Sequence, residues 1–131
     1  MTKARAINVW QALDGLRFLD GRTATTPPEE TEQAFANLSQ YRDGGIFIGH
    51  YSGTSEWEKH PRGDEIVLVL EGQTTLILLA EEGESRHLLR EHELLVVPEN
   101  TWHRFEAPLG AKLLTVTPQP TDHSLEHPAK G

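Results

Sequence analysis

The chain has 131 residues, and its 37% hydrophobic and 24% charged residues are typical of one globular domain with a hydrophobic core. With 12 basic against 20 acidic side chains its formal net charge is −8, which argues against nucleic acid or an anionic membrane as a partner, because phosphates attract positive surfaces. There is no cysteine and no long apolar run, which excludes disulfides, thiolate chemistry and a membrane span and leads us to expect a cytoplasmic protein.

Residues 1–44 are predicted to form an N-terminal extension that contains one short helix. Residues 1–25 mix apolar side chains with glycines and indicate one or two short edge strands or loops. Thr26 stands before two prolines, and this pattern is typical of a helix start, because threonine caps helices and the first turn tolerates proline. The predicted helix covers about residues 28–38, with Phe35 on its inward face.

Residues 45–117 carry short apolar segments separated by glycine, proline and asparagine. Most of these segments are rich in β-branched or aromatic residues, and almost no helix signal follows residue 40. Many short strands in succession indicate an all-β sandwich or barrel. The predicted strands cover residues 46–51, 65–70, 74–79, 86–89, 94–97, 103–106 and 112–117. Residues 118–131 are polar and are predicted to form a loose tail, or an arm laid over a neighbour, on what is otherwise a single domain.

Four potential metal ligands lie around the predicted turns of this region: Glu58, His60, Glu65 and His103. The period of two along a strand puts Glu58 and His60 on one face, and Glu65 shares a face with two valines. A carboxylate on such an apolar face needs a partner, and a divalent cation would supply one; a buried arginine or a hydrogen bond would also do so. The alternatives are a solvated carboxylate at Glu58 and core histidines with ordinary hydrogen bonds.

These residues resemble the two sequence motifs of the cupin superfamily. The first motif of that family has two histidines, a glutamate and a closing glycine, and the second has a proline followed by a histidine. Carried over by spacing, the matching positions are His60, Glu65, Gly72, Pro98 and His103. The resemblance covers about residues 45–117. It implies a double-stranded β-helix, or jelly-roll barrel, with the histidines and the glutamate as metal ligands.

Five positions depart from the family pattern: Gly53, Glu58, His92, Asn100 and Ala107. Gly53 stands one residue closer than the pattern asks, His92 replaces the leading glycine of the second motif, and Ala107 replaces its final asparagine. Glu58 stands where the family has its first histidine, so the expected site has two histidines and two carboxylates: Glu58, His60, Glu65 and His103. Asn100 replaces a glycine of the second motif, which is a mild change because asparagine tolerates the left-handed backbone conformation. Oxygen and imidazole ligands suit manganese, iron(II), nickel or zinc.

The resemblance implies a metal-binding barrel that acts on a small molecule as a dioxygenase, isomerase or lyase. The alternatives are a non-catalytic module that binds or senses a small ligand, and a structural protein stabilised by an ion. The candidate acid or base is His50, on the expectation that it shares the inward face of its strand with Ile46 and Ile48; the alternative is Glu58, displaced from the metal. Candidate charge anchors for a substrate are Arg17, Arg42 and Arg104.

A homodimer is expected. Ile66, Leu68 and Leu70 face away from the proposed site, so a second sheet or a partner subunit should cover them. The resemblance to small cupins also implies a homodimer, because these proteins commonly form dimers.

Overall fold

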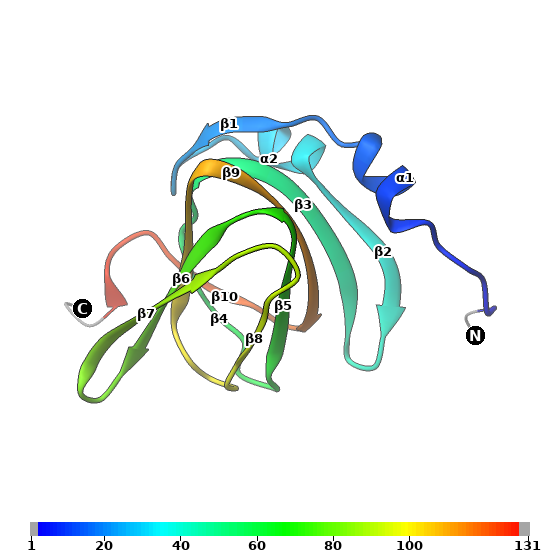
Figure 1. The fold of residues 1–131 in the computed structure, drawn as a ribbon. Coiled ribbons are helices and arrows are strands. Elements are labelled where there is room, and N and C mark those ends of the chain that lie inside the picture. Colours follow the sequence, from blue (N-terminus) through cyan, green and yellow to red (C-terminus); the bar gives the residue numbers. More distant parts are fainter. Residues whose placement is uncertain (1–2, 129–131) are drawn as a thin grey trace.

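The computed structural model describes residues 3–128, and β-strands dominate it (Figure 1). The elements in chain order are α1 (Val9–Asp14), β1 (Leu19–Arg22), α2 (Pro28–Ala34), β2 (Phe35–Tyr41), β3 (Gly44–Thr54), β4 (Trp57–Lys59), β5 (Glu65–Gly72), β6 (Thr74–Ala80), β7 (Gly83–Leu89), β8 (Leu94–Val97), β9 (His103–Pro118) and β10 (Asp122–Ser124). Together they form the all-β jelly-roll barrel that the resemblance implies.

The N-terminal region departs from its prediction in two places. A helix that was not predicted, α1, begins at the N-cap Asn8, whose side chain accepts a hydrogen bond from the backbone of Gln11 at 2.9 Å. The predicted helix of residues 28–38 ends earlier, at Ala34, because the backbone of Phe35 is extended and β2 starts there. Pairing with β3 stabilises the extended conformation of these residues more than their helix propensity stabilises a helix. The predicted cap is also wrong, because the N-cap residue is Pro27 and not Thr26.

The strand β9 holds the barrel together because four strands pair along it. Along one edge it pairs with β4 and then, on both sides of a bulge, with β3; along the other edge it pairs first with β6 and then with β5. The two strands predicted here are thus one continuous element, in which the residues from Pro108 to Gly110 are bulged out of the pairing with β3. Gly110 has a positive φ of 97° at this bulge. On one side lie β2, β3, β5 and β8, and on the other β6, β7, β4 and β10 (Figure 1).

The alternation predicted for β5 is confirmed. Glu65, Val67 and Val69 are buried, whereas Ile66 is exposed and faces outward. The inner face packs against a cluster from β3, β6, β8 and β9. Asn100, which stands in place of a motif glycine, has a positive φ of 59°, and its amide donates to the carbonyl of His60 at 2.9 Å. This backbone bond ties the loop before His103 to the residue that follows β4.

The described part of the C-terminal segment, up to residue 128, packs against its own barrel, whereas a loose tail or an arm over a neighbour was predicted. Asp122–Ser124 form β10, which pairs antiparallel with β4 (Figure 1). This segment therefore covers the strand that precedes His60. Among residues 3–128, no helix combines the length and the apolar character that crossing a membrane requires.

Candidate functional site

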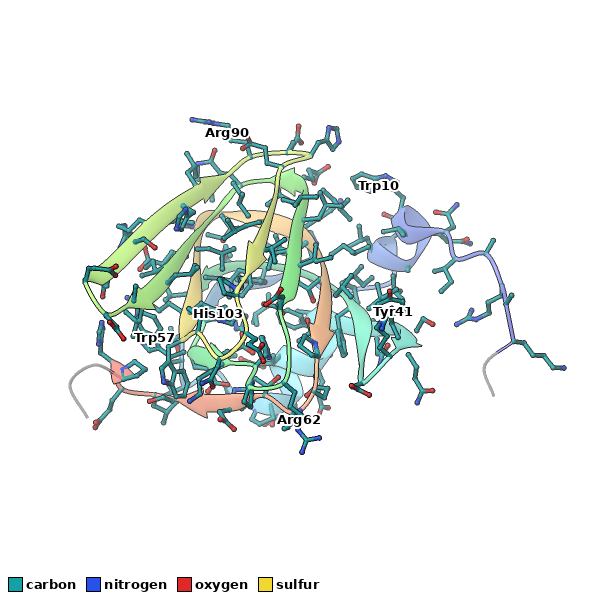
Figure 2. All side chains as sticks on the ribbon, turned by 90° about the horizontal axis from the view of Figure 1, so that it is seen from below. Trp10, Tyr41, Trp57, Arg62, Arg90 and His103 are labelled. Carbon is teal, nitrogen blue, oxygen red and sulfur yellow. The ribbon has the colours of Figure 1, made fainter. Side chains whose placement is uncertain are left out.

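Three of the four predicted ligands meet inside the barrel: His60, Glu65 and His103. Nε2 of His103 lies 3.1 Å from Oε1 of Glu65, and Nε2 of His60 lies 3.4 Å from Oε2. All three residues are buried, and their ligand atoms lie within 4.8 Å of one another. His60 follows β4, Glu65 begins β5 and His103 begins β9, so the chain brings them together at one end of three strands. His103 lies in the middle of the barrel (Figure 2).

The far side of each imidazole is held by the protein. Nδ1 of His103 donates to the carbonyl of Thr101 at 2.9 Å, and Nδ1 of His60 lies 2.9 Å from the hydroxyl of Thr121. That hydroxyl can donate to Gln119 at 3.4 Å, which leaves it to accept from His60. With a proton on Nδ1 of each neutral ring, Nε2 keeps its lone pair and faces Glu65. This is the arrangement in which metal-binding histidines are usually held.

The donor set fits a divalent cation. Ligand distances of about 2.0–2.2 Å imply separations of about 3.0–3.5 Å between neighbouring ligand atoms in tetrahedral or octahedral sites. The separations of 3.1 and 3.4 Å from Glu65 to His103 and His60 fall in this range. Nε2 of His60 is buried without a hydrogen-bond partner among the described residues. A buried nitrogen in this position gains a partner if a cation lies between it and Glu65.

The three groups shift one another's pKa values. Burial alone would raise the pKa of Glu65, but the hydrogen bond from His103 and the electrostatic attraction of both imidazoles outweigh it and lower that pKa to about 2. Burial alone would lower the pKa of His103, yet the hydrogen bond and the charge of Glu65 raise it. Without a metal, the carboxylate of Glu65 and a proton on His103 thus stabilise each other. A metal ion would replace the proton on His103.

Glu58 lies beside the three clustered residues. Its oxygens are outside the group of ligand atoms that lie within 4.8 Å of one another, although its backbone is in register with His103. Burial, and next the charge of Glu65, raise its pKa. Its side chain lines the cavity described next. Its role as a fourth ligand, which the sequence predicts, therefore stays a prediction.

A cavity of about 380 Å³ opens beside Glu58 and Glu65, a volume within the usual range of small-molecule sites. Most of its wall is apolar, and its polar groups are few. The apolar wall includes Phe35, Phe47, Ile48, Tyr51, Phe105 and Leu113. The polar side chains on the wall include Arg22, Thr117, Gln119, Thr121 and His123.

The predicted position of His50 is wrong. Tyr51, not His50, faces the interior, where it is 1% exposed and belongs to the hydrophobic core. His50 stacks on Phe18 with 4.6 Å between ring centroids and lines a separate groove. The sequence prediction put His50 on the inward face because the apolar Ile46 and Ile48 precede it at intervals of two residues. His50 therefore does not line the cavity beside Glu58 and Glu65, and its role as an acid or base stays a prediction.

The candidate charge anchors also lie elsewhere. Arg17 hydrogen-bonds to Gln33, Arg42 contacts Tyr41 and Arg104 pairs with Glu106, and none of the three lines the cavity. The guanidinium on the cavity wall belongs to Arg22, which the sequence reading did not single out. No local pattern marks it, because parallel pairing with β3 brings β1 there. The threonines of β9 carry a clearer signal, since Thr115 and Thr117 alternate with apolar residues.

Comparison with known proteins agrees with this architecture. YdbB of Bacillus subtilis (strain 168), an uncharacterized protein, is 29% identical over 77 residues, which make up 57% of this chain and 66% of the relative. The crystal structure of NMB1881 from Neisseria meningitidis matches with a TM-score of 0.60 at 19% identity, covering 92% of this chain and all of that one. Hydroquinone 1,2-dioxygenase from Sphingomonas sp. TTNP3, solved with 4-hydroxybenzoate bound, matches with a TM-score of 0.56 at 20% identity and covers 79% of this chain and 71% of that one.

At these identities the solved structures establish a common fold alone. A family model for the cupin domain matches residues 48–117, which is more than half of the chain. The matched segment starts within β3, runs almost to the end of β9 and contains all four predicted ligands. The chain belongs to the cupin domain family.

Proposed function

We propose that the protein is a metal-dependent enzyme of the oxygenase class that acts on a small, largely apolar molecule. The observation that carries this proposal is the buried set of two imidazoles and one carboxylate, His60, His103 and Glu65, beside a cavity of about 380 Å³. Two histidines and one carboxylate with open coordination positions are the ligand set of non-haem iron(II) oxygenases. The fold shared with a hydroquinone 1,2-dioxygenase is consistent with this class.

In this proposal each residue has a distinct task. A bound metal supplies Lewis acidity and a centre at which oxygen can be activated. His60, Glu65 and His103 hold the metal, and Thr101, Thr117 and Thr121 fix the orientation of these ligands through the hydrogen bonds described above.

The cavity wall binds the substrate and limits the access of water. Phe47, Phe105 and Leu113 provide apolar surface for the body of the molecule. Glu58 lines the same wall with a raised pKa, so it is suited to hold or accept a proton at its carboxyl group. Glu58, which lies outside the group of three metal ligands, is thus the residue that transfers a proton to or from the substrate.

The experiment is metal analysis followed by oxygen uptake. Protein purified without chelator or nickel resin should carry about one divalent ion per chain, and iron(II)-loaded protein should consume oxygen with one or more of a panel of hydroquinones, catechols, thiols and keto acids. His103→Gln should abolish both. His87→Gln is the matched control, because His87 lies on β7 and bonds to Ser85 away from the cavity.

The two parts of the proposal fail separately. Wild-type protein that binds no metal, with a His103→Gln variant of unchanged stability, would overturn the metal centre. Protein that binds one metal ion but leaves oxygen untouched across the panel would overturn the oxygenase class. The latter result would favour the alternative function, a non-catalytic module that binds or senses a small ligand.

A further inference from the structure

Arg22 places an unpaired positive charge on the wall of the cavity. It is the last residue of β1, and its guanidinium carbon lies 5.0 Å from the ring centroid of Phe35 and 4.9 Å from that of Tyr51. Among the residues that the structure describes, no carboxylate forms an ion pair with it. Stacking uses the faces of a guanidinium and leaves its N–H edges free to bind an anion.

The position of Arg22 is fixed by close packing of the backbone. β1 pairs in parallel with β3, with Arg22 opposite Gly53. A Cβ atom at Gly53 would collide with the backbone nitrogen and oxygen of Arg22. One step earlier, the hydroxyl of Ser52 accepts from the amide of Gly21 at 2.8 Å and donates to Asp20 at 2.7 Å. The guanidinium therefore starts from a strand that is held tightly against the barrel.

A second unused donor lies next to it. The hydroxyl of Tyr51 is buried on the cavity wall, and no described residue accepts its proton, although the Arg22 guanidinium lies close enough to interact with its oxygen. A buried polar group without a partner costs stability, so such a group on a cavity wall indicates that a ligand provides the missing bond. Arg22 and Tyr51 both offer donors, which together match an anionic oxygen group.

The acidic groups of the wall do not fill this subsite. Glu32 is exposed to solvent on α2, so water screens its charge. Glu65 is already paired with His103, at 3.1 Å. Glu58 is close enough for the charge of Arg22 to favour its ionised form, but the two side chains form no ion pair. An incoming anion thus meets a free guanidinium rather than a completed pair.

We propose that the cavity takes a small apolar carboxylic acid, whose carboxylate is bound by Arg22 and the Tyr51 hydroxyl while its body, a planar ring, packs against the aromatic wall. The proposal rests on the proposed function, since it names the substrate class of the same site. The carboxylate lies at Arg22 and not on the metal. A carboxylate accepts two parallel hydrogen bonds from one guanidinium, which gives affinity and orientation together.

The test compares benzoate with benzamide, which share size and shape and differ in charge, by isothermal titration calorimetry on protein stripped of metal with chelator. Wild-type protein should bind benzoate about tenfold or more tightly than benzamide. Arg22→Gln should remove this difference and leave benzamide binding unchanged, and Tyr51→Phe should weaken benzoate binding by a smaller factor. Arg104→Gln is the matched control, because Arg104 also stacks on an aromatic ring, Trp57, but does not line the cavity.

Thermal unfolding shows whether each variant is folded, and Arg22→Lys is a second variant in case Arg22→Gln is not. If Arg22→Gln unfolds, Arg22→Lys retains the charge and should keep part of the preference for benzoate. Equal affinity for benzoate and benzamide in wild-type protein overturns the proposal, as does equal benzoate affinity in Arg22→Gln and wild type. Benzoate that binds only after metal is added would place the carboxylate on the metal and would also overturn it. These titrations measure ligand binding to metal-free protein, whereas the proposed function is tested by metal analysis and oxygen uptake. Either proposal can therefore fail without the other.

Discussion

Thr117 on β9 donates its hydroxyl proton to Oε2 of Glu65 on β5, with 2.6 Å between the two oxygens. Both residues are buried, so the bond is largely shielded from bulk water. The bond joins two strands and also fixes the carboxylate that faces His60 and His103. Orientation of the metal ligands therefore depends on a residue that the sequence motifs do not include.

Thr117→Val should weaken metal binding without removing a ligand. Valine has nearly the shape of threonine but cannot donate a hydrogen bond. Glu65 therefore stays in position but loses the bond that orients its Oε2 atom. We expect metal affinity to fall by about tenfold and the free energy of unfolding to fall by about 1–3 kcal/mol. Competition with a chelating dye and urea unfolding measure the two effects. Thr115→Val is the control, because Thr115 contacts Thr117 but not Glu65, and an equal loss of affinity there would contradict the argument.

The stability of the metal-free protein should be highest in mildly acidic solution. Glu65 has a folded-state pKa of about 2 against an ordinary value of 4.5, so its stabilising contribution is complete above about pH 4.5 and is lost as the pH falls toward 2. The pKa of His103 is raised above 6.5, so its contribution is complete below that pH and is lost as the pH rises through the raised value. Urea unfolding across pH measures both limbs. Glu65→Gln should flatten both, and an unchanged profile in that variant would refute the pairing.

Glu58→Gln should separate a proton-transfer role from a ligand role. Because burial raises the pKa of Glu58, the folded protein is destabilised wherever this group is charged. The substitution should therefore stabilise the metal-free protein at neutral pH and have little effect below about pH 4, where the carboxyl is neutral in both states.

The same variant should keep its metal and lose its activity. With three ligands left intact, elemental analysis should still find one ion per chain, whereas turnover should fall by about 10²–10⁴-fold if Glu58 moves the proton. Loss of the metal together with the activity would instead make Glu58 the fourth ligand, which is the role that its place in the motif predicts.

The spacing of residues predicted the fold and three of the clustered side chains. His60, Glu65 and His103 were predictable because their spacing resembles the motifs of a known family. Strand alternation accounts for the burial of Glu65 on one face with Val67 and Val69. Asn100 was predictable for a similar reason, since its left-handed conformation is a property of that residue in its own turn.

What the sequence missed depends on pairing between distant segments. Phe35 continues a helical pattern, yet pairing with Gly49 across β2 and β3 makes it a strand residue. Arg22 reaches the cavity only because β1 pairs with β3. Thr121 reaches His60 because the C-terminal segment folds back along β4. Such contacts come from tertiary packing, which local propensity does not encode.

A homodimer remains a prediction, and the outer face of β5 and β8 is where we expect it to form. Ile66 and Val96 are paired across these strands, and Leu94 lies on the same face; their exposed fractions are 39%, 47% and 58%. Among the strands that the structure describes, β8 pairs with β5 alone, so it is also an edge strand. Val96→Lys should convert a dimer into a monomer in light scattering. Leu109→Lys, at an exposed position on β9, should not. A monomeric wild type would contradict the expectation.

Gly53→Ala should disturb the anion subsite through the backbone of Arg22. Gly53 has a φ of 107°, and an added Cβ would also collide with Arg22 on β1. Gly83 has a φ of 123° but nothing within 4 Å of such a Cβ, so Gly83→Ala isolates the cost of backbone strain. We expect Gly83→Ala to lower the free energy of unfolding by about 1–3 kcal/mol and Gly53→Ala to lower it further. Only Gly53→Ala should weaken benzoate binding, because only there does relief of the collision move the guanidinium. Equal effects of the two substitutions on stability and on benzoate affinity would show that β1 is not held in place by this contact.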